Sequence, residues 1–444
     1  MKLIHHGAHQ GVTGSCHELQ YDSQKSLLVD CGTFQGDEAV KHPNPEIEFS
    51  LGSIQSLLLT HVHIDHVGRV PYLFAAGFDK PIYCSEPTAK LLPLVIEDSL
   101  RIGFTRSRHL INKFLSLIDD SLVPLKYGVW HRIHDGLQIR LSPAGHVLGS
   151  TIFEIQLNTG ETVVFTGDIG PGNDPLLNKP VIPPKADLLV MESTYGDRNH
   201  ETTHDRETIL ENVIHHTLDD LGVTIIPAFS LGRTQSLLYE LNRIFERVQA
   251  SEGRTFMKRI DVIVDSPLAS RFTQLYKDLS DYWNIEAQHH VSTKEQPLVF
   301  ENLVTVGDHR EHKSILDHLE KHELPAIVIA GSGMCTGGRI VNYLKRFLGD
   351  KRTDVVFVGY QASGTPGHHL IRGSDWVRLQ GRKYHVEADI HRISGYSAHA
   401  DQTGLIDFVA SMDQPPKKIR LVHGDFRPKR ILTEKLTAMG YDVE

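Results

Sequence analysis

The sequence predicts an α/β protein of two domains, in which a strand-and-helix segment lies between two strand-rich segments. The chain has 444 residues, which is more than one hydrophobic core usually supports. Residues 1–205 have the pattern of short strands with turns between them, residues 206–380 alternate strands with helices, and residues 381–444 return to a strand-like pattern. Alternating strands and helices are typical of a parallel sheet with crossover helices, so the middle segment is expected to be doubly wound.

Apolar and polar residues alternate along several short runs of the first segment, as they do in half-buried strands. These expected strands are residues 26–30, 55–60, 137–141, 151–157 and 162–166, and one helical stretch near 86–118 interrupts them. In the middle segment, helical spacing of apolar residues predicts helices over 206–221, where Gly222 is a stop signal, and over 237–248. The other expected strands are residues 223–227, 260–264, 326–330, 355–358 and, in the last segment, 384–390.

Composition and charge narrow the function classes. Hydrophobic residues make up 40% and charged residues 23% of the chain, as in soluble globular proteins. Lys and Arg total 46 against 55 Asp and Glu, and the resulting formal charge of −9 argues against nucleic-acid binding unless the basic residues cluster. Basic clusters occur at 101–113, 417–420 and 427–430, although each is more typical of a solvated face.

The chain shows no membrane or disulfide signature. No apolar run approaches the roughly 20 residues that span a bilayer, and residues 1–7 lack the apolar core of a signal peptide, so we expect no membrane partner and a cytoplasmic location. None of the four cysteines lies in a Cys-x-x-Cys pair, so neither a disulfide framework nor a cysteine-built zinc site is expected.

The strongest chemical signal is the run HVHIDH at residues 61–66, which directly follows an expected strand ending at Thr60. It places His61, His63, Asp65 and His66 within six positions. A strand end followed by a tight loop can turn several side chains toward one point. Because imidazole and carboxylate groups are common ligands of zinc and similar ions, the run predicts a metal-dependent hydrolytic site.

Two further strands end in turns that contain glycine and a potential ligand. His146 follows the strand at 137–141, and Asp168 follows the strand at 162–166. A lone histidine or aspartate at a strand end is usually a turn residue. In a chain that already has a metal-type cluster, both become candidate ligands, and a carboxylate such as Asp168 could bridge two ions.

Together with Asp30, these residues resemble the metallo-β-lactamase family, whose fold is a four-layer αββα sandwich. The resemblance implies that Asp30 orients the metal-site loops from behind the ligands. It implies one metal ion held by His61, His63, His146 and Asp168, and a second held by Asp65, His66, Asp168 and a later histidine.

Three later motifs resemble the β-CASP nucleases of that family: residues 191–196 (MESTYG), 397–401 (SAHAD) and 422–425 (VHGD). Those enzymes carry an inserted α/β domain between the first two motifs. The resemblance therefore implies a metallo-β-lactamase αββα sandwich, residues 1–205 and 381–444, with an inserted Rossmann-like parallel α/β (β-CASP) domain, residues 206–380. It makes His423 the later ligand, and Asp65, Glu192 and His399 the catalytic residues.

Two loops of the middle segment are candidate phosphate sites. Residues 227–235 (PAFSLGRTQ) and the glycine-rich residues 331–338 (GSGMCTGG) resemble β-CASP loops, and each precedes an expected helix. Backbone N–H groups at a helix start, with an arginine beside them, can hold a phosphate. The expected phosphate or RNA contacts are Arg233, Thr234, Ser332, Gly333, Thr336 and Gly337.

The resemblance favours an RNA substrate, because β-CASP enzymes that act on RNA have histidine at the position of His423, whereas the DNA-repair branch typically has valine. The short prokaryotic relatives of the cleavage and polyadenylation specificity factor nuclease are the most similar group. The resemblance implies hydrolysis of single-stranded RNA by two metal ions, leaving a 5′-phosphate and a 3′-hydroxyl, with endonuclease or 5′–3′ exonuclease mode left open. Two Zn²⁺ are expected, with Mn²⁺ as an alternative in vitro, and a homodimer is favoured.

Three alternatives stay open on the sequence alone. A small-molecule hydrolase of the same fold needs neither a large inserted domain nor the later acidic and histidine motifs. A catalytically silent RNA-binding scaffold would be expected to have lost ligands, yet every ligand position here is filled. A DNA nuclease is disfavoured by His423.

Overall fold

The computed structural model of the 444-residue chain describes residues 1–252, 260–292 and 296–444. The chain folds into two compact units. Unit 1 comprises residues 1–173, 177–199 and 399–444, and unit 2 comprises residues 174–176 and 200–398. Among the described residues, no helix combines the length and apolar character that a membrane crossing requires.

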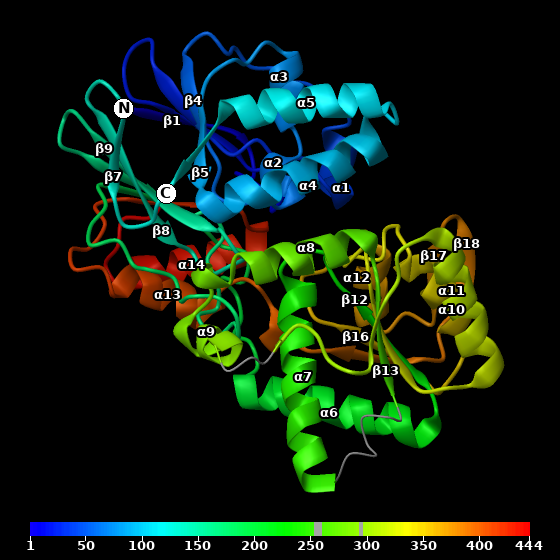
Figure 1. The fold of residues 1–444 in the computed structure, drawn as a ribbon. Coiled ribbons are helices and arrows are strands. Elements are labelled where there is room, and N and C mark those ends of the chain that lie inside the picture. The colour runs from blue at the N-terminus through cyan, green and yellow to red at the C-terminus, as the bar shows by residue number, and fades with distance from the viewer. Residues whose placement is uncertain (253–259, 293–295) are drawn as a thin grey trace. The chain divides into compact units, whose positions relative to one another are not determined.

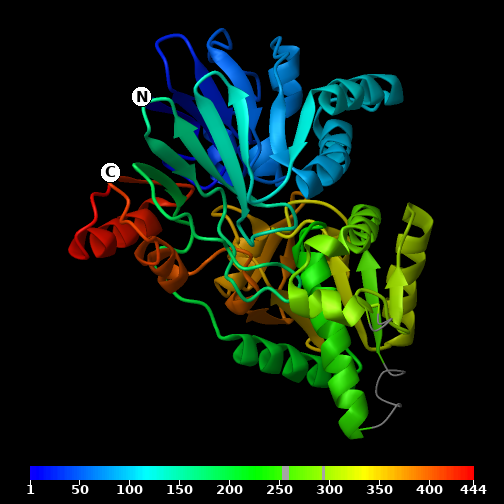
Figure 2. The ribbon, with the colours of Figure 1, turned by 60° about the vertical axis from the view of Figure 1, so that its left-hand side comes forward.

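Unit 1 contains two six-stranded sheets (Figures 1 and 2). The first has the order β1 (Lys2–Gly7), β2 (Cys16–Gln20), β3 (Ser26–Val29), β4 (Ile54–Leu58), β5 (Ile82–Ser85) and β6 (Leu122–Leu125). The second has the order β20 (Ile419–Val422), β11 (Leu188–Glu192), β10 (Thr162–Phe165), β9 (Thr151–Leu157), β8 (Leu137–Pro143) and β7 (Trp130–His134). One apolar core joins the sheets, since it includes Leu27 and Leu58 from the first and Phe153 and Ile155 from the second.

Helices cover the outer faces of both sheets. On the first sheet, α4 (Glu86–Gly103) packs against β5 and β6 and against α5 (Arg108–Ser121). On the second sheet, α13 (Gln402–Ala410) and α14 (Phe426–Ala438) bury Leu405, Leu432 and Leu436 in a core shared with β10 and β11. The layers of unit 1 therefore follow the order αββα. Its short helices are α1 (Gly36–Lys41), α2 (Ile64–Val67) and α3 (Val70–Ala75).

The helical stretch expected near 86–118 is two helices rather than one. Ser85 caps the first, since its Oγ accepts a hydrogen bond from the backbone N–H of Thr88. Residues 104–107 separate α4 from α5, and the ring of Phe104 makes an edge contact with Phe114 of α5. Gly103, the last residue of α4, is a stop signal that could have marked the break.

Unit 2 is built on one six-stranded sheet whose strands are all parallel. The order is β14 (Leu303–Thr305), β13 (Asp261–Asp265), β15 (Ala326–Ala330), β12 (Val223–Pro227), β16 (Thr353–Phe357) and β19 (Asp389–Arg392). Helices on one face are α10 (His309–His322), α11 (Ile340–Phe347) and α12 (Pro366–Ile371). The others are α6 (Thr203–Asp220), α7 (Arg233–Glu252), α8 (Pro267–Asp278) and α9 (Ile285–Ser292), with single 3₁₀ turns at Ser280–Tyr282 and Ser394–Tyr396. Unit 2 has the doubly wound arrangement expected for the middle segment.

One expected strand is wrong in detail. The run expected at 384–390 is split between β18 (Arg382–His385) and β19 (Asp389–Arg392). β18 pairs with β17 (Trp376–Leu379) in a separate hairpin, whereas β19 pairs in parallel with β16 of the main sheet. Because β19 pairs with the main sheet, residues 381–398 group with unit 2 in the structure. The boundaries at 205/206 and 380/381 stay a prediction.

Candidate metal centre

The predicted ligands of unit 1 all stand where strands end. His61 and His63 follow β4, and the backbone of His63 is extended at the N-cap of α2, which carries Asp65 and His66. His146 follows β8, Asp168 follows β10, and His423 follows β20. Since the strands of the second sheet end at one edge, loops that are distant in sequence bring their side chains together. These seven residues, His61, His63, Asp65, His66, His146, Asp168 and His423, are called the metal cluster below.

Left-handed backbone residues turn the chain at this edge. Gly145 and Gly167 have φ of 71° and 54°, and each directly precedes a predicted ligand. A Cβ on Gly167 would lie 2.7 Å from Cβ of Thr60, so only glycine fits there. Asp30 and His423 adopt φ of 58° and 48° without being glycine, which costs about 1–3 kcal/mol each and is typical of functional sites.

Asp168 lies at the centre of the cluster. Its Oδ2 is 3.5 Å from Nε2 of His61 and 3.4 Å from Nε2 of both His66 and His146. Nδ1 of His63 lies 3.1 Å from His61 Nε2 and 3.0 Å from His146 Nε2. One ligand atom from each of His61, His63, His146 and Asp168 therefore lies within 4.8 Å of the others, which fits a single cation.

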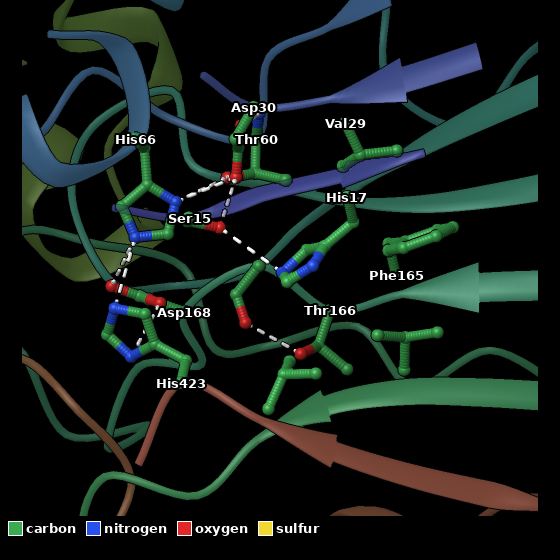
Figure 3. A pocket seen from close by; sticks show the side chains of 13 residues that line it. Ser15, His17, Val29, Asp30, Thr60, His66, Phe165, Thr166, Asp168 and His423 are labelled. Atoms are coloured by element: carbon green, nitrogen blue, oxygen red, sulfur yellow. Dashed lines mark hydrogen bonds and ion pairs between the residues drawn. The ribbon is translucent and has the colours of Figure 1, made fainter. Parts of the chain in front are cut away.

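A second group adjoins the first through Asp168. Nε2 of His423 lies 3.3 Å from His66 Nε2 and 3.5 Å from Oδ2 of Asp65. Ligand atoms of Asp65, His66 and His423 form a second set within 4.8 Å of one another. Oδ1 of Asp168 is 3.5 Å from His423 Nδ1, so Asp168 faces both sets. Figure 3 shows His66 and His423 pointing at Asp168 from two sides.

Asp30 lies behind His66 and ties the loops together. Its Oδ1 accepts the backbone N–H of Thr60 at 2.8 Å, and its Oδ2 accepts the Thr60 hydroxyl at 2.8 Å. Nδ1 of His66 donates to Oδ2 of Asp30 at 2.7 Å, which leaves Nε2 of that ring directed at Asp168 (Figure 3). This is the geometry expected of a residue that orients a metal ligand through its second ring nitrogen.

Glu192 and His399 meet beside the cluster. Glu192, at the end of β11, is fully buried, and its Oε1 accepts the backbone N–H of Ile169 at 2.6 Å. Nδ1 of His399 lies 3.1 Å from both oxygens of Glu192 and 4.0 Å from Oδ2 of Asp168. Residues of three predicted motifs, separated by up to 231 positions (168 to 399) in the chain, are thus in contact.

Burial and neighbouring charges set the protonation of the cluster. Burial lowers the pKa of His61 well below its usual value and that of His63 to about 4, so both rings are neutral, as metal ligands must be. For His66, burial lowers the pKa, but the carboxylates of Asp168 and Asp30 outweigh it and raise the pKa well above its usual value. For His399, burial also lowers the pKa, but the carboxylate of Glu192 outweighs this effect and raises the pKa to about 9.

The donor set fits a resident cation. Among the described residues, Oδ1 of Asp168 is buried without a hydrogen-bond partner, although a buried carboxylate oxygen is costly to leave unsatisfied. Several imidazole nitrogens face one another at 3.0–3.3 Å, and neutral rings can supply only one N–H each. A cation at the centre would accept these lone pairs and the carboxylate together.

The predicted phosphate residues lie in unit 2 and have intramolecular partners. Arg233 is buried and its Nη1 is 3.9 Å from Oδ2 of Asp174, while the buried Thr234 hydroxyl donates to the carbonyl of Phe229 at 2.8 Å. The Ser332 hydroxyl accepts the backbone N–H groups of Thr336 at 3.1 Å and Gly337 at 3.4 Å. Gly333 is buried in the same loop, and Thr336 is exposed. Phosphate contact by these residues stays a prediction.

Sequence reasoning missed the residues that support the cluster from behind. Thr194 Oγ1 lies 3.1 Å from Nδ1 of His423, and Ser15 Oγ donates to Asp30 at 3.5 Å. Ser15 and His17 line a cavity of about 20 Å³ behind His66, which has room for one water molecule (Figure 3). Thr194 could have been found, because it belongs to the same motif as Glu192, whereas Ser15 and His17 carry no sequence signal.

Three known families match consecutive parts of the chain. Residues 10–211 match the metallo-β-lactamase superfamily, residues 234–370 match the β-CASP domain, and residues 383–444 match a domain described as the Zn-dependent metallo-hydrolase RNA specificity domain. These matches confirm the predicted fold class, the use of metal and the class of hydrolase.

Whole-chain relatives agree with this assignment. The ribonuclease TTHA0252 of Thermus thermophilus is 36% identical over 99% of this chain and 95% of its own length. The transcription termination factor FttA of Methanocaldococcus jannaschii is 30% identical over 94% of this chain, which spans 66% of that protein's length. FttA of Methanothermobacter thermautotrophicus is 31% identical over 96% of this chain and 67% of its own length. The chain belongs to the β-CASP branch of the metallo-β-lactamase superfamily.

Proposed function

We propose that this protein is a metal-dependent ribonuclease that hydrolyses phosphodiester bonds of single-stranded RNA and leaves a 5′-phosphate and a 3′-hydroxyl. The observation that carries the proposal is the pair of buried Glu192 and partly exposed His399, in which His399 Nδ1 lies 4.0 Å from Oδ2 of the central Asp168 of the metal cluster. An acid–base pair beside a cation site is what hydrolysis of a charged ester requires, because a hydroxide equivalent and a proton for the leaving oxygen are both needed.

The seven residues of the metal cluster would hold two Zn²⁺ ions, one with His61, His63, His146 and Asp168 and one with Asp65, His66 and His423. Bound divalent ions of this kind lower the pKa of water to about 7 and offset negative charge on a phosphoryl group. Asp30 would keep His66 in the orientation in which Nε2 faces the cluster. Asp65, which is partly exposed, would lie where substrate meets the cluster.

His399 would act as the general acid. Its Nδ1 is held by Glu192, so we assign Nε2 as the nitrogen that gives its proton to the leaving 3′ oxygen. The pKa of His399, raised to about 9 by Glu192 against the effect of burial, keeps the ring protonated near neutral pH. Glu192 would stabilise that protonated form and fix the ring.

RNA is the substrate favoured by three observations. The chain aligns over nearly its whole length with a protein named a ribonuclease, and residues 383–444 match a domain described by RNA specificity. His423 also favours RNA, because β-CASP enzymes that act on RNA have histidine at this position. We also propose that the protein is cytoplasmic and forms a homodimer.

The test uses one internally labelled RNA sequence in three forms: with a 5′-monophosphate, with a 5′-triphosphate and as a circle. The proposal expects cleavage with 5′-phosphate and 3′-hydroxyl ends, and loss of cleavage after chelation. Cutting of the circle would establish endonuclease mode, and release of mononucleotides from the 5′-monophosphate form alone would establish the exonuclease mode. Turnover of a chromogenic lactam or thioester with no cleavage of any RNA form would overturn the proposal in favour of a small-molecule hydrolase.

A further inference from the structure

A short β-hairpin of unit 2 plays no part in the metal centre. β17 and β18 pair in an antiparallel register, with Trp376 opposite His385 and Arg378 opposite Lys383. Gln380 and Gly381 connect the strands with φ of 47° and 83°, which is the type I′ turn that suits a two-residue hairpin loop. Figure 1 shows both strands, in yellow and orange, close to α11.

The two faces of the hairpin differ sharply. Val377 and Leu379 are buried in the core that α11 and α12 share with the main sheet. Because side chains alternate along a strand, the residues between and beside them point the other way. The outer face therefore carries Trp376, Arg378, Lys383 and His385, all of which are exposed.

The outer face of the hairpin is cationic. Segment 372–385 contains four Lys or Arg residues and one Asp, in a chain whose net charge is −9. Within the described parts of the chain, neither Arg378 nor Lys383 forms an ion pair. His385 is 3.3 Å from Glu387 at the open end of the hairpin.

One other basic cluster of the chain, residues 417–420, behaves differently. Lys417 lies 2.6 Å from Asp187, and both Lys418 and Arg420 form ion pairs with Glu444. Their charge is thus largely balanced within the protein. The hairpin instead sets two like charges directly opposite each other, which destabilises a sheet, and leaves 55% of Trp376 exposed to solvent.

We propose that the outer face of this hairpin, Trp376, Arg378, Lys383 and His385, is a binding surface for single-stranded RNA outside the metal centre. The inference deepens the proposed function, on which it rests, by naming where part of the substrate backbone is held. Arg378 and Lys383 would contact phosphates, and the Trp376 ring would stack against a base.

Single-stranded RNA is favoured by the composition of the face. Unpaired cations supply the charge that phosphates need, and an exposed indole supplies a stacking platform for an unpaired base. The base of a duplex is already stacked on both sides, so a duplex would use only the cations. Side chains two positions apart on a strand are about 6.6–6.8 Å apart, so the face is long enough for adjacent nucleotides rather than for one small ion.

The experiment measures the affinity of a labelled 30-nucleotide single-stranded RNA over a range of salt concentrations, in the wild type and in the His399→Ala background, which we expect to cut slowly. R378Q/K383Q should bind more weakly and should make the slope of log affinity against log salt less steep by about 1.4, which is 0.7 for each lost phosphate contact. Trp376→Ala should weaken binding about 5- to 100-fold with an unchanged slope.

The chain offers matched controls for both changes. K80Q/R132Q removes the same charge from exposed residues that are already paired, with Asp79 at 2.8 Å and Asp135 at 3.0 Å. Trp130→Ala removes a tryptophan that is 36% exposed and covered by Arg140. Both controls should leave the affinity and the salt slope unchanged.

Equal losses in the hairpin and control variants would overturn the inference, because binding would then follow net charge alone. The inference would also be overturned if R378Q/K383Q aggregated but bound RNA with unchanged affinity. Arg378 and Lys383 would then serve only to prevent the strands from pairing with another chain. If the protein bound duplex DNA as tightly as single-stranded RNA and Trp376→Ala had no effect, the hairpin would bind polyanions in general rather than single-stranded RNA. If the wild-type protein bound RNA through the hairpin but never cut it, this inference would stand and the proposed ribonuclease function would be rejected.

Discussion

The metal cluster of unit 1 and the two predicted phosphate loops of unit 2 make an instructive pair. Both were identified from short motifs at strand ends. In the cluster, side chains point at one another and leave Asp168 Oδ1 without a hydrogen-bond partner among the described residues. In the loops, Arg233, Thr234 and Ser332 have intramolecular partners. The donor atoms of the cluster thus converge as a cation site requires, whereas the polar groups of the loops are satisfied within folded turns.

The two cases differ in how specifically a motif predicts a function. A ligand set restricts both residue type and position, because several imidazoles and carboxylates must meet at one point. A glycine-rich loop restricts only backbone shape, and the same shape serves a turn or a phosphate site. If this contrast holds, substitutions in the cluster should abolish or slow cleavage, whereas substitutions in the loops should lower stability.

Asp168→Ala should abolish activity. Asp168 faces both ligand groups, so its loss should lower metal affinity by more than the about 10–100-fold that loss of an outer partner costs. Metal content by mass spectrometry and cleavage of labelled RNA would measure the two effects. Asp135→Ala, an exposed carboxylate in a surface ion pair, is the control. Full metal content together with full cleavage in Asp168→Ala would show that the cluster is not the site.

His399→Ala should reduce the cleavage rate by about 10²–10⁴-fold while metal content stays near that of the wild type. The reason is that His399 meets Glu192 rather than lying among the seven cluster residues. Glu192→Gln should give a smaller loss of the same kind, because the ring keeps a hydrogen-bonding neighbour. A large loss of metal in His399→Ala would instead make His399 a ligand, which its place in a group with Asp168, Glu192 and His423 also allows.

Arg233→Met should act on stability. Arg233 is buried against Asp174, and breaking a buried pair leaves an uncompensated charge that costs about 3 kcal/mol or more. Urea denaturation of the full chain would measure this, with Arg132→Met at an exposed pair as a control that changes stability by less than about 0.5 kcal/mol. Unchanged stability with a large loss of RNA affinity would place Arg233 on a phosphate after all.

Ser332→Ala should have the smallest effect, a loss of about 1 kcal/mol of stability with cleavage kinetics close to wild type. Its hydroxyl accepts the backbone N–H groups of Thr336 and Gly337, and these would lose their acceptor. Ser332→Thr keeps the hydroxyl and serves as the conservative variant. If Ser332→Ala raised KM for RNA at unchanged stability, the predicted phosphate contact would gain the support that the geometry does not supply.

Sequence alone predicted which side chains would meet in unit 1. The four candidate ligands in HVHIDH, and His146 and Asp168 after glycine turns, follow from residue type and strand position, and the parallel sheet of unit 2 follows from the alternation of strands and helices. The split of residues 384–390 could not be predicted, because it depends on which strand pairs with which neighbour. Ser15 and His17 were missed because a residue that supports a ligand from behind needs only a polar side chain at the right place in the fold, and no sequence pattern marks that place.

A zinc titration would show whether cleavage of RNA depends on metal held in the cluster. Metal-free protein would receive Zn²⁺ in measured steps, with RNA cleavage followed at each step. Our account predicts no cleavage without metal and a rise that reaches its plateau at two ions per chain. Cleavage by the metal-free protein at the full rate would contradict it, and a plateau at one ion would contradict the two-ion arrangement around Asp168.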